Sequence, residues 1–259
     1  MRIATWNVNS LKARLPRVEQ WLSEIQPDVL CMQETKLSDD TFPALAFQAL
    51  GYDAVYHGEG RWNGVAILSR VGLSDPVNGF AGDHPVPSAE ARLISATCGP
   101  VRVATVYVPN GRSPDHEQFR MKLDWLARLR LHLDACDASE NMLLCGDFNI
   151  APDDRDVYDP AAYIGDTHVT RAERDALADL EAWGLVDVFR RRHEEGGLFT
   201  WWDYRAGNFH KHLGMRIDLM LATKTLADRM RWILVDRNAR KGQGPSDHAP
   251  MVAEFDMGL

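Results

Sequence analysis

Four short segments of the chain place acid, amide or imidazole side chains directly beside an apolar run. They read Thr5-Trp6-Asn7-Val8-Asn9, Met32-Gln33-Glu34-Thr35-Lys36, Leu144-Cys145-Gly146-Asp147-Phe148-Asn149 and Pro245-Ser246-Asp247-His248-Ala249-Pro250. Carboxylate and amide oxygens are ligands that suit Mg²⁺, and imidazole and amide donors can hold phosphate oxygens. If the fold gathers these segments into one cleft, the cleft would suit a divalent cation and a phosphate ester. The pattern therefore predicts a metal-dependent phosphodiesterase.

Some of these residues also have ordinary structural explanations. Asn9 or Ser10 could cap the helix that follows, whereas Asn7 comes too early for that role and is expected to be an oxygen ligand or a phosphate contact. Glu34 ends a strand as apolar as Val29-Leu30-Cys31-Met32, where an uncompensated carboxylate would be costly. A bound cation removes that cost, so Glu34 is predicted to be a metal ligand.

The other polar residues form two pairs. Asp147 and Asn149 alternate along the chain and face one side if the strand continues, although Gly-Asp-x-Asn is also typical of a turn. Asp218 lies within an apolar strand segment and needs a buried partner. His248 is the natural candidate, because a carboxylate can fix the tautomer of an imidazole and raise its basicity.

Apolar periodicity predicts the elements that must position these segments. Strands are expected at residues 2–8, 29–33, 52–57, 64–69, 91–97, 102–108, 142–145, 198–204, 216–222, 230–235 and 249–255, and helices at 11–25, from 39 or 40 to about 51, at 115–136 and at 171–183. The helix at 115–136 has one apolar face, and its Arg and Lys residues are expected on the other. Residues 151–170 look loop-like. Strands and helices mix without strict alternation, which predicts an α/β fold of two packed sheets with helices outside, as one domain over residues 1–259.

The composition is that of an ordinary folded domain. The chain has 259 residues, of which 45% are apolar and 25% charged, and no apolar stretch approaches the roughly 20 residues that cross a bilayer. No leader precedes the first strand, so we expect a cytoplasmic protein without membrane contact, and a monomer because nothing marks an interface. The cysteines Cys31, Cys98, Cys136 and Cys145 lack Cys-x-x-Cys spacing and are expected to be reduced thiols rather than zinc ligands.

The charge pattern bears on the partner. A net charge of −8 does not exclude nucleic acid, because binding depends on local patches more than on the sum. Basic clusters at Arg190-Arg191-Arg192-His193 and His210-Lys211-His212 flank the aromatic run Phe199-Thr200-Trp201-Trp202-Asp203-Tyr204. A basic cluster alone is more often a solvated surface, but two of them beside an aromatic run favour DNA.

The assembled motifs resemble the exonuclease III type of apurinic/apyrimidinic (AP) endonuclease, within the endonuclease/exonuclease/phosphatase superfamily. Further matching segments are Asn63-Gly64-Val65-Ala66, Tyr107-Val108-Pro109-Asn110-Gly111, Trp183-Gly184-Leu185-Val186-Asp187 and Trp201-Trp202-Asp203-Tyr204-Arg205, in order over essentially the full length. The resemblance implies a four-layer α/β sandwich and dependence on Mg²⁺ or Mn²⁺. It also implies a role in base excision repair: cleavage of double-stranded DNA 5′ to abasic sites, with 3′→5′ exonuclease and 3′-end-trimming activity.

The resemblance also implies roles for individual residues. The metal would be held by Glu34, with Asn7, Asp247, Asp147 and Asn149 near the ion. Asp147 would orient or deprotonate the attacking water, Asn149 and Asn7 would hold the scissile phosphate, and Asp218 would orient His248, which stabilises charge on phosphorus.

On the substrate side, the resemblance implies phosphate contacts from Tyr107 and Asn110. A small apolar pocket for a flipped-out abasic sugar would be formed by Trp201, Met215 and Ile217, although Ile217 has an ordinary core explanation as well. The segment from Arg205 to Gly214, with Lys211, would approach DNA.

Two other interpretations remain open. A phosphatase or a non-DNA phosphodiesterase on the same catalytic core would share its acids and its histidine. The features that favour DNA are the aromatic run at 199–204, the basic segment after it and Tyr107-Val108-Pro109-Asn110. A catalytically inactive DNA-binding protein would have lost some of these core residues, and none is lost.

Overall fold

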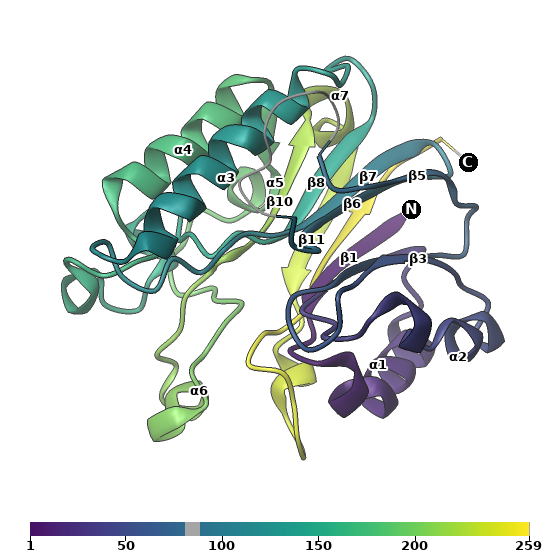
Figure 1. The fold of residues 1–259 in the computed structure, drawn as a ribbon, viewed down its shortest axis with the longest axis horizontal. Helices are drawn as coiled ribbons and strands as arrows, with labels where there is room; N and C mark the ends of the chain where they lie inside the picture. Colours follow the sequence, from purple (N-terminus) through teal and green to yellow (C-terminus); the bar gives the residue numbers. More distant parts are fainter. Residues whose placement is uncertain (81–88, 259) are drawn as a thin grey trace.

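Two six-stranded mixed sheets pack face to face in the computed structural model, which describes residues 1–80 and 89–258 (Figure 1). The first has the order β11-β12-β1-β2-β4-β3 and contains β1 (Arg2–Asn7), β2 (Val29–Gln33), β3 (Asp53–His57), β4 (Val65–Ser69), β11 (Met230–Val235) and β12 (Met251–Phe255). The second has the order β5-β6-β7-β8-β10-β9 and contains β5 (Ser74–Asn78), β6 (Leu93–Cys98), β7 (Val101–Tyr107), β8 (Met142–Asp147), β9 (Leu185–Asp187) and β10 (Asp218–Thr223).

Each sheet has one parallel pair at its centre, flanked by antiparallel neighbours. In the first sheet the pair is β1 with β2, which ends with Asn7 beside Gln33. In the second it is β7 with β8, which ends with Tyr107 beside Asp147. Parallel strands end at the same edge, so the polar residues that follow each pair are brought together by the sheet itself.

Helices cover both outer faces. The helices α1 (Leu11–Ile25) and α2 (Ala44–Ala49) pack on the first sheet, and α3 (Glu117–Leu133) and α4 (Arg171–Ala182) lie side by side on the second (Figure 1). Shorter helices are α5 (Val188–Arg192), α6 (Asn208–Lys211) and α7 (Lys224–Ala227). The four layers confirm the predicted α/β sandwich.

Among the helices of residues 1–80 and 89–258, none is long and apolar enough to cross a membrane.

The core between the sheets explains why the central strands are almost entirely apolar. Side chains such as Ile3, Val29, Val103 and Leu143 are fully buried between the sheets, while alternate residues of the same strands face the helices. Strands that are covered on both faces have no need for polar alternation. Three cysteines, Cys31, Cys98 and Cys145, are free and buried in this core, as expected.

Most predicted elements are confirmed within a few residues, but the strand predicted at 198–204 is wrong. Trp201 makes only isolated bridges, to Met215 and to His248, and no ladder forms. The edge strand β5 was not predicted, because its residues are exposed and include Pro76, so it has no apolar pattern. The short elements β9, α5 and α7 were also not predicted, and residues 151–170 contain short 3₁₀ turns at Asp154–Asp156 and Pro160–Tyr163.

The polar face predicted for α3 is also partly wrong. Lys122 and Arg128 are buried, as is His132, alongside Phe119 and Leu129. The helix is covered on more than one side because α4 packs beside it as well as the sheet beneath it (Figure 1).

Candidate active site

The polar ends of the two parallel pairs meet at one edge of the sandwich. The Asn7 side-chain amide donates to Glu34 Oε1 and to Asp147 Oδ2, both at 2.9 Å. One amide therefore joins three of the four sequence segments and links the two sheets. Asn7 and Asp147 are buried, whereas Glu34 is partly accessible, so the group opens to solvent on the side of Glu34.

The fourth segment brings His248 beside this group. Asp218 lies on β10 directly opposite Asp147 in register, and its Oδ2 accepts from His248 Nδ1 at 2.8 Å. The other ring nitrogen, Nε2, lies 3.8 Å from Asp147 Oδ2. Both the carboxylate and the imidazole are buried, so the predicted contact between Asp218 and His248 is present in the structure.

The surroundings decide the protonation of these groups. Burial alone would lower the pKa of His248, but the charges of Asp218 and Asp147 outweigh it and raise this pKa to about 10. Burial raises the pKa of Asp147 to about 7, against the opposing effect of His248. Burial, with the charges of Glu34 and Asp147, raises the pKa of Tyr107 well above its ordinary value. His248 and Tyr107 are therefore proton donors near neutral pH, and Asp147 is poised to accept a proton.

Two sets of oxygen and nitrogen atoms could be considered for a metal. The ligand atoms of Asp147, Asp218 and His248 lie within 4.8 Å of one another. A protonated imidazole has no lone pair to give to a metal, however, and Asp218 already accepts from it, so this set is better explained as a proton-transfer group. Glu34 and Asp147 both accept from Asn7 Nδ2, so two carboxylates lie around one amide, and carboxylate oxygens are donors that fit a hard divalent cation. Lys36 Nζ forms an ion pair with Glu34 Oε2 at 2.8 Å.

Asn149 adopts the turn rather than the continued strand. The strand β8 ends at Asp147, Asn149 has a φ of 52°, and its backbone N–H donates to Asp147 Oδ1 at 2.9 Å. Its side-chain amide donates to Val108 O at 2.9 Å, and its Oδ1 accepts from Asn110 Nδ2 at 3.2 Å. The turn nevertheless sets Asn149 beside both Asp147 and Asn110, so the predicted phosphate-contact residues lie next to each other.

The capping role considered for Asn9 and Ser10 is not found. Ser10 is the residue before α1, and its side chain makes no capping bond. Asn9 instead donates to Asp247 Oδ1 at 2.9 Å and accepts from Lys36 Nζ at 2.7 Å. Burial acts to raise the pKa of Asp247, but the charge of His248 and the hydrogen bonds from Asn9 and Trp201 outweigh it, so the pKa is lowered. Asn9 thus connects Asp247 to the Glu34–Lys36 pair.

The three residues of the expected sugar pocket lie together beside the site. Met215 and Ile217 are buried in a small apolar cluster, and Trp201 packs against it as the half-buried member. The Trp201 indole N–H donates to Asp247 Oδ2 at 3.1 Å, which fixes this ring next to the polar group. In the structure Met215 and Ile217 serve as core, so only Trp201 presents surface.

The two basic residues of the expected DNA-facing segment lie farther out. Arg205 is exposed and pairs with Asp203 at 2.6 Å, and Lys211 is exposed at the end of α6. This segment projects from the body of the molecule, as Figure 1 shows at the label α6.

Sequence reasoning missed three polar residues behind the asparagines: Lys122 and Glu173, which are buried, and His168, which is partly buried. Burial lowers the pKa of His168 to about 4, so its ring is neutral. Its Nδ1 lies 2.6 Å from Asn149 O, and because a carbonyl only accepts, this nitrogen carries the proton. A signal for Lys122 was present: it lies three residues after Phe119 and four before Leu126, within the apolar stripe of α3.

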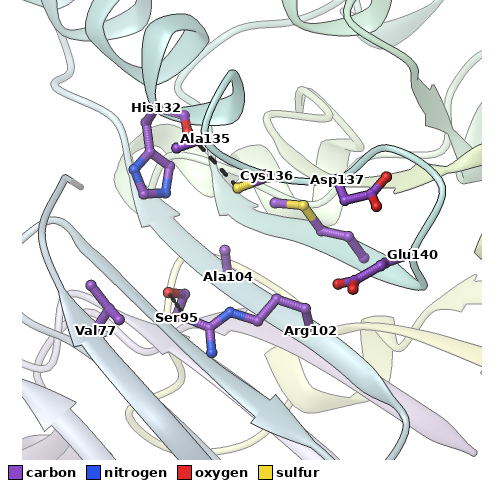
Figure 2. Close-up of a pocket in the computed structure, with 10 residues that line it drawn as sticks. Val77, Ser95, Arg102, Ala104, His132, Ala135, Cys136, Asp137 and Glu140 are labelled. Carbon is purple, nitrogen blue, oxygen red and sulfur yellow. Dashed lines mark hydrogen bonds between the residues drawn. The ribbon is translucent and has the colours of Figure 1, made fainter. Parts of the chain in front are cut away.

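A cavity of about 370 Å³ lies away from this site (Figure 2). It is lined by residues at the start of β7 and the end of α3, including Arg102, His132 and Cys136. The residues described above end β7 and β8 at the opposite edge, so this cavity is not part of the candidate active site.

The site and fold correspond to a known family. Residues 4–248 match the model of the Endonuclease/Exonuclease/phosphatase family, and the chain belongs to that family. It is 34% identical to exodeoxyribonuclease III of Haemophilus influenzae over 98% of this chain and 100% of that protein. The predicted family is therefore confirmed.

Solved structures give the same result. An AP endonuclease from Archaeoglobus fulgidus superposes with a TM-score of 0.95 at 39% identity, covering 99% of this chain and 100% of that one. The 3′-5′ exonuclease NExo from Neisseria meningitidis superposes with a TM-score of 0.94 at 41% identity, covering 99% and 100%. A structure of NExo described as a 3′ phosphatase, bound to a product DNA hairpin, has a TM-score of 0.95 at 41% identity, covering 99% of each chain.

Proposed function

We propose that the chain is a divalent-metal-dependent DNA phosphodiesterase of base excision repair that trims 3′ ends and cleaves 5′ to abasic sites. The observation that carries the proposal is the single amide of Asn7 that joins Glu34 to Asp147, with His248 and Asp218 directly behind. This arrangement supports a cation site, a proton acceptor and a charged donor around one position. The relatives named above, with their exonuclease, AP endonuclease and 3′ phosphatase descriptions, support DNA as the substrate.

Each group has a role that its surroundings support. Glu34 and Asn7 would hold Mg²⁺ or Mn²⁺, with Asp247 nearby, and the ion would supply positive charge to the phosphate. Asp147 would take the proton of the attacking water, because its raised pKa makes it a base near neutral pH. His248, kept cationic by Asp218, would stabilise the charge that develops on the phosphate oxygens.

The remaining groups would bind the phosphate and its DNA. Tyr107 remains a phenol and donates, while Asn110 and Asn149 offer adjacent amides. Trp201 with Met215 and Ile217 would contact the sugar beyond the scissile bond, and Arg205 and Lys211 on the projecting segment would contact the DNA backbone.

A second candidate, a phosphatase acting on 3′ phosphates as its main reaction, is favoured by one observation. The relatives described as AP endonuclease and as 3′ phosphatase are about equally similar to this chain, at 39% and 41% identity. Both reactions break a phosphorus–oxygen bond with the same groups, and they differ in what lies on either side of the phosphate.

Three duplexes test the proposal: one with a single abasic analogue, one with a 3′ phosphate and one intact. Each is incubated in Mg²⁺, in Mn²⁺ and in EDTA, with the Asp147→Asn variant as control. We expect metal-dependent incision 5′ to the lesion, release of phosphate from the second duplex and shortening of the third. The ratio of the first two rates decides between the two candidates. If all three duplexes remain intact under every metal, the substrate is not DNA.

We further propose that the chain acts as one domain, as a monomer, in the cytoplasm. The pairing of β1 with β12 supports the single domain, because the first and last strands share one sheet. The buried free thiols suit a reducing compartment. Light scattering of the purified protein tests the monomer.

A further inference from the structure

A buried lysine lies beneath the two asparagines of the candidate site. Lys122 has no exposed side-chain surface, and its ammonium donates to Asn149 O at 2.7 Å, to Asn110 O at 3.3 Å and to Glu173 Oε1. An ammonium has three donors, and they are shared among these acceptors and Thr167 Oγ1, which lies 3.5 Å from the nitrogen. Lys122 therefore hydrogen-bonds to the backbone of two loops that are far apart in sequence.

The carboxylate of Glu173, which pairs with Lys122, hydrogen-bonds to a third loop. Glu173 Oε1 also accepts from the Thr167 hydroxyl at 2.8 Å and from the His168 backbone N–H at 2.9 Å. Its Oε2 accepts from the Thr170 backbone N–H at 3.0 Å and from the Thr170 hydroxyl at 2.7 Å. The carboxylate thus caps the start of α4 and binds the loop before it, while the ammonium of Lys122 contacts it from α3.

Stability alone does not explain this pair. Two fully buried charges are costly to desolvate, and well-packed apolar side chains of similar volume often stabilise a core as well or better. An apolar pair could not bind the Asn110 and Asn149 carbonyls, however. Packing around the pair is also close: a Cβ built on Gly111 would lie 3.0 Å from Thr167 Oγ1 and 3.1 Å from Lys122 Cδ. The loops therefore have little room to shift while the ion pair is intact.

We propose that Lys122 and Glu173 are positioning residues of this site, which fix the backbone of residues 109–111 and 148–150 and thereby the spacing of the Asn110 and Asn149 side chains. The catalytic half of this inference rests on the proposed function, while the backbone half does not. A displacement of about 1 Å in a group that binds substrate can cost about 100-fold in rate. Loss of the Lys122–Glu173 ion pair should therefore slow the reaction, although neither residue contacts the substrate.

Hydrogen exchange tests the backbone half directly. In Lys122→Met, we expect amide exchange in peptides spanning 109–112 and 148–151 to become at least about tenfold faster than in the unchanged protein. Leu129→Ala is the matched control, because Leu129 is buried on the same helix and its loss also destabilises the core. Equal acceleration of these peptides in both variants would overturn the proposal. If Lys122→Met does not fold, Lys122→Met/Glu173→Gln removes both charges and replaces it.

Kinetics test the catalytic half. On the 3′-phosphate duplex, Lys122→Met should lower kcat about 10- to 100-fold with KM changed less than about threefold, whereas Leu129→Ala should leave kcat unchanged below its unfolding temperature. In an Asn149→Ala background, Lys122→Met should cost less than about threefold, because its main effect acts through Asn149. Fully additive losses would contradict a positioning role. If the unchanged protein cleaves no DNA, the proposed function fails, and the exchange experiment alone decides the role of Lys122.

Discussion

Two buried charged clusters lie next to each other in this protein and differ in how their charges are balanced. In the cluster behind the asparagines, Lys122 and Glu173 neutralise each other and every donor of the ammonium has an acceptor. In the cluster at the edge of the sheets, the carboxylates of Glu34, Asp147, Asp218 and Asp247 outnumber the cations Lys36 and His248. The charges of the first cluster are balanced without a further ion, whereas a bound divalent cation would offset the excess negative charge of the second.

The buried histidines show the same contrast within one residue type. His248 has Asp218 at 2.8 Å, and its pKa rises to about 10 although burial opposes the charge. His132, in α3, has its pKa lowered to about 4 by burial and by the nearby charges of Arg128 and Arg102. The same side chain is thus cationic in one place and neutral in the other, and only the former is suited to stabilise a phosphate.

Removal of a charged group from the edge cluster should have the largest effect. We expect His248→Asn to lower kcat by about 10³-fold or more, because the cation that meets the developing charge is lost, and Asp147→Asn to do the same through loss of the base. DNA affinity should stay within a few-fold. Single-turnover kinetics with a parallel binding titration measure both, and full activity in either variant would refute the proposed mechanism.

Breaking the balanced cluster should lower stability in addition to its expected effect on kcat. Lys122→Met leaves the Glu173 carboxylate buried without its cation, which should lower the free energy of unfolding by about 3–5 kcal/mol. The double variant Lys122→Met/Glu173→Gln should recover part of that loss, since neither charge remains. Urea denaturation of the single and double variants measures the difference. A double variant less stable than the single one would show that the pair is not charge-balanced in the way described.

The difference between the clusters also explains what the sequence could predict. The edge cluster lies where apolar strands end, so Asn7, Glu34 and Asp147 were predictable from strand patterns and from the family resemblance. The partner of Asp218 was predictable because a buried acid needs one. Lys122 was not predicted, although it lies within the apolar stripe of α3, because a lysine in a helix is usually solvated. Its burial depends on Glu173 of α4, with which it pairs.

The loops were less predictable for a related reason. The segment at 198–204 has the aromatic composition of a strand, yet Phe199 and Trp202 are buried in a small cluster with Ala249, and Trp201 forms only isolated bridges. Asn149 lies beside Asp147, but its left-handed backbone is a turn that alternation along a strand does not predict. In both cases long-range contacts, which no local pattern contains, decide the backbone.

The pH dependence of stability should separate the neutral histidine from the charged one. The pKa of His132 is about 4 in the folded state, below the ordinary value of 6.5, so the unfolded chain takes up a proton first as the pH falls. Its contribution is therefore complete above pH 6.5 and is lost between pH 6.5 and about 4, by up to about 3 kcal/mol. His132→Gln should flatten this part of the unfolding free energy plotted against pH. An unchanged slope in the variant would show that other groups dominate acid unfolding.

The smallest predicted change concerns the cation that would complete the edge cluster. Glu34→Gln keeps the oxygen that accepts from Asn7 but removes the charge, so we expect the Mg²⁺ concentration for half-maximal activity to rise at least about tenfold. At saturating Mg²⁺ much of the rate should return, because His248 and Asp147 remain. Asp40→Asn, which removes an exposed carboxylate nearby in sequence, is the control and should leave the metal titration unchanged. If Glu34→Gln needs the same Mg²⁺ concentration for half-maximal activity as the unchanged protein, the cation is held by the other carboxylates of the edge cluster and not by Glu34.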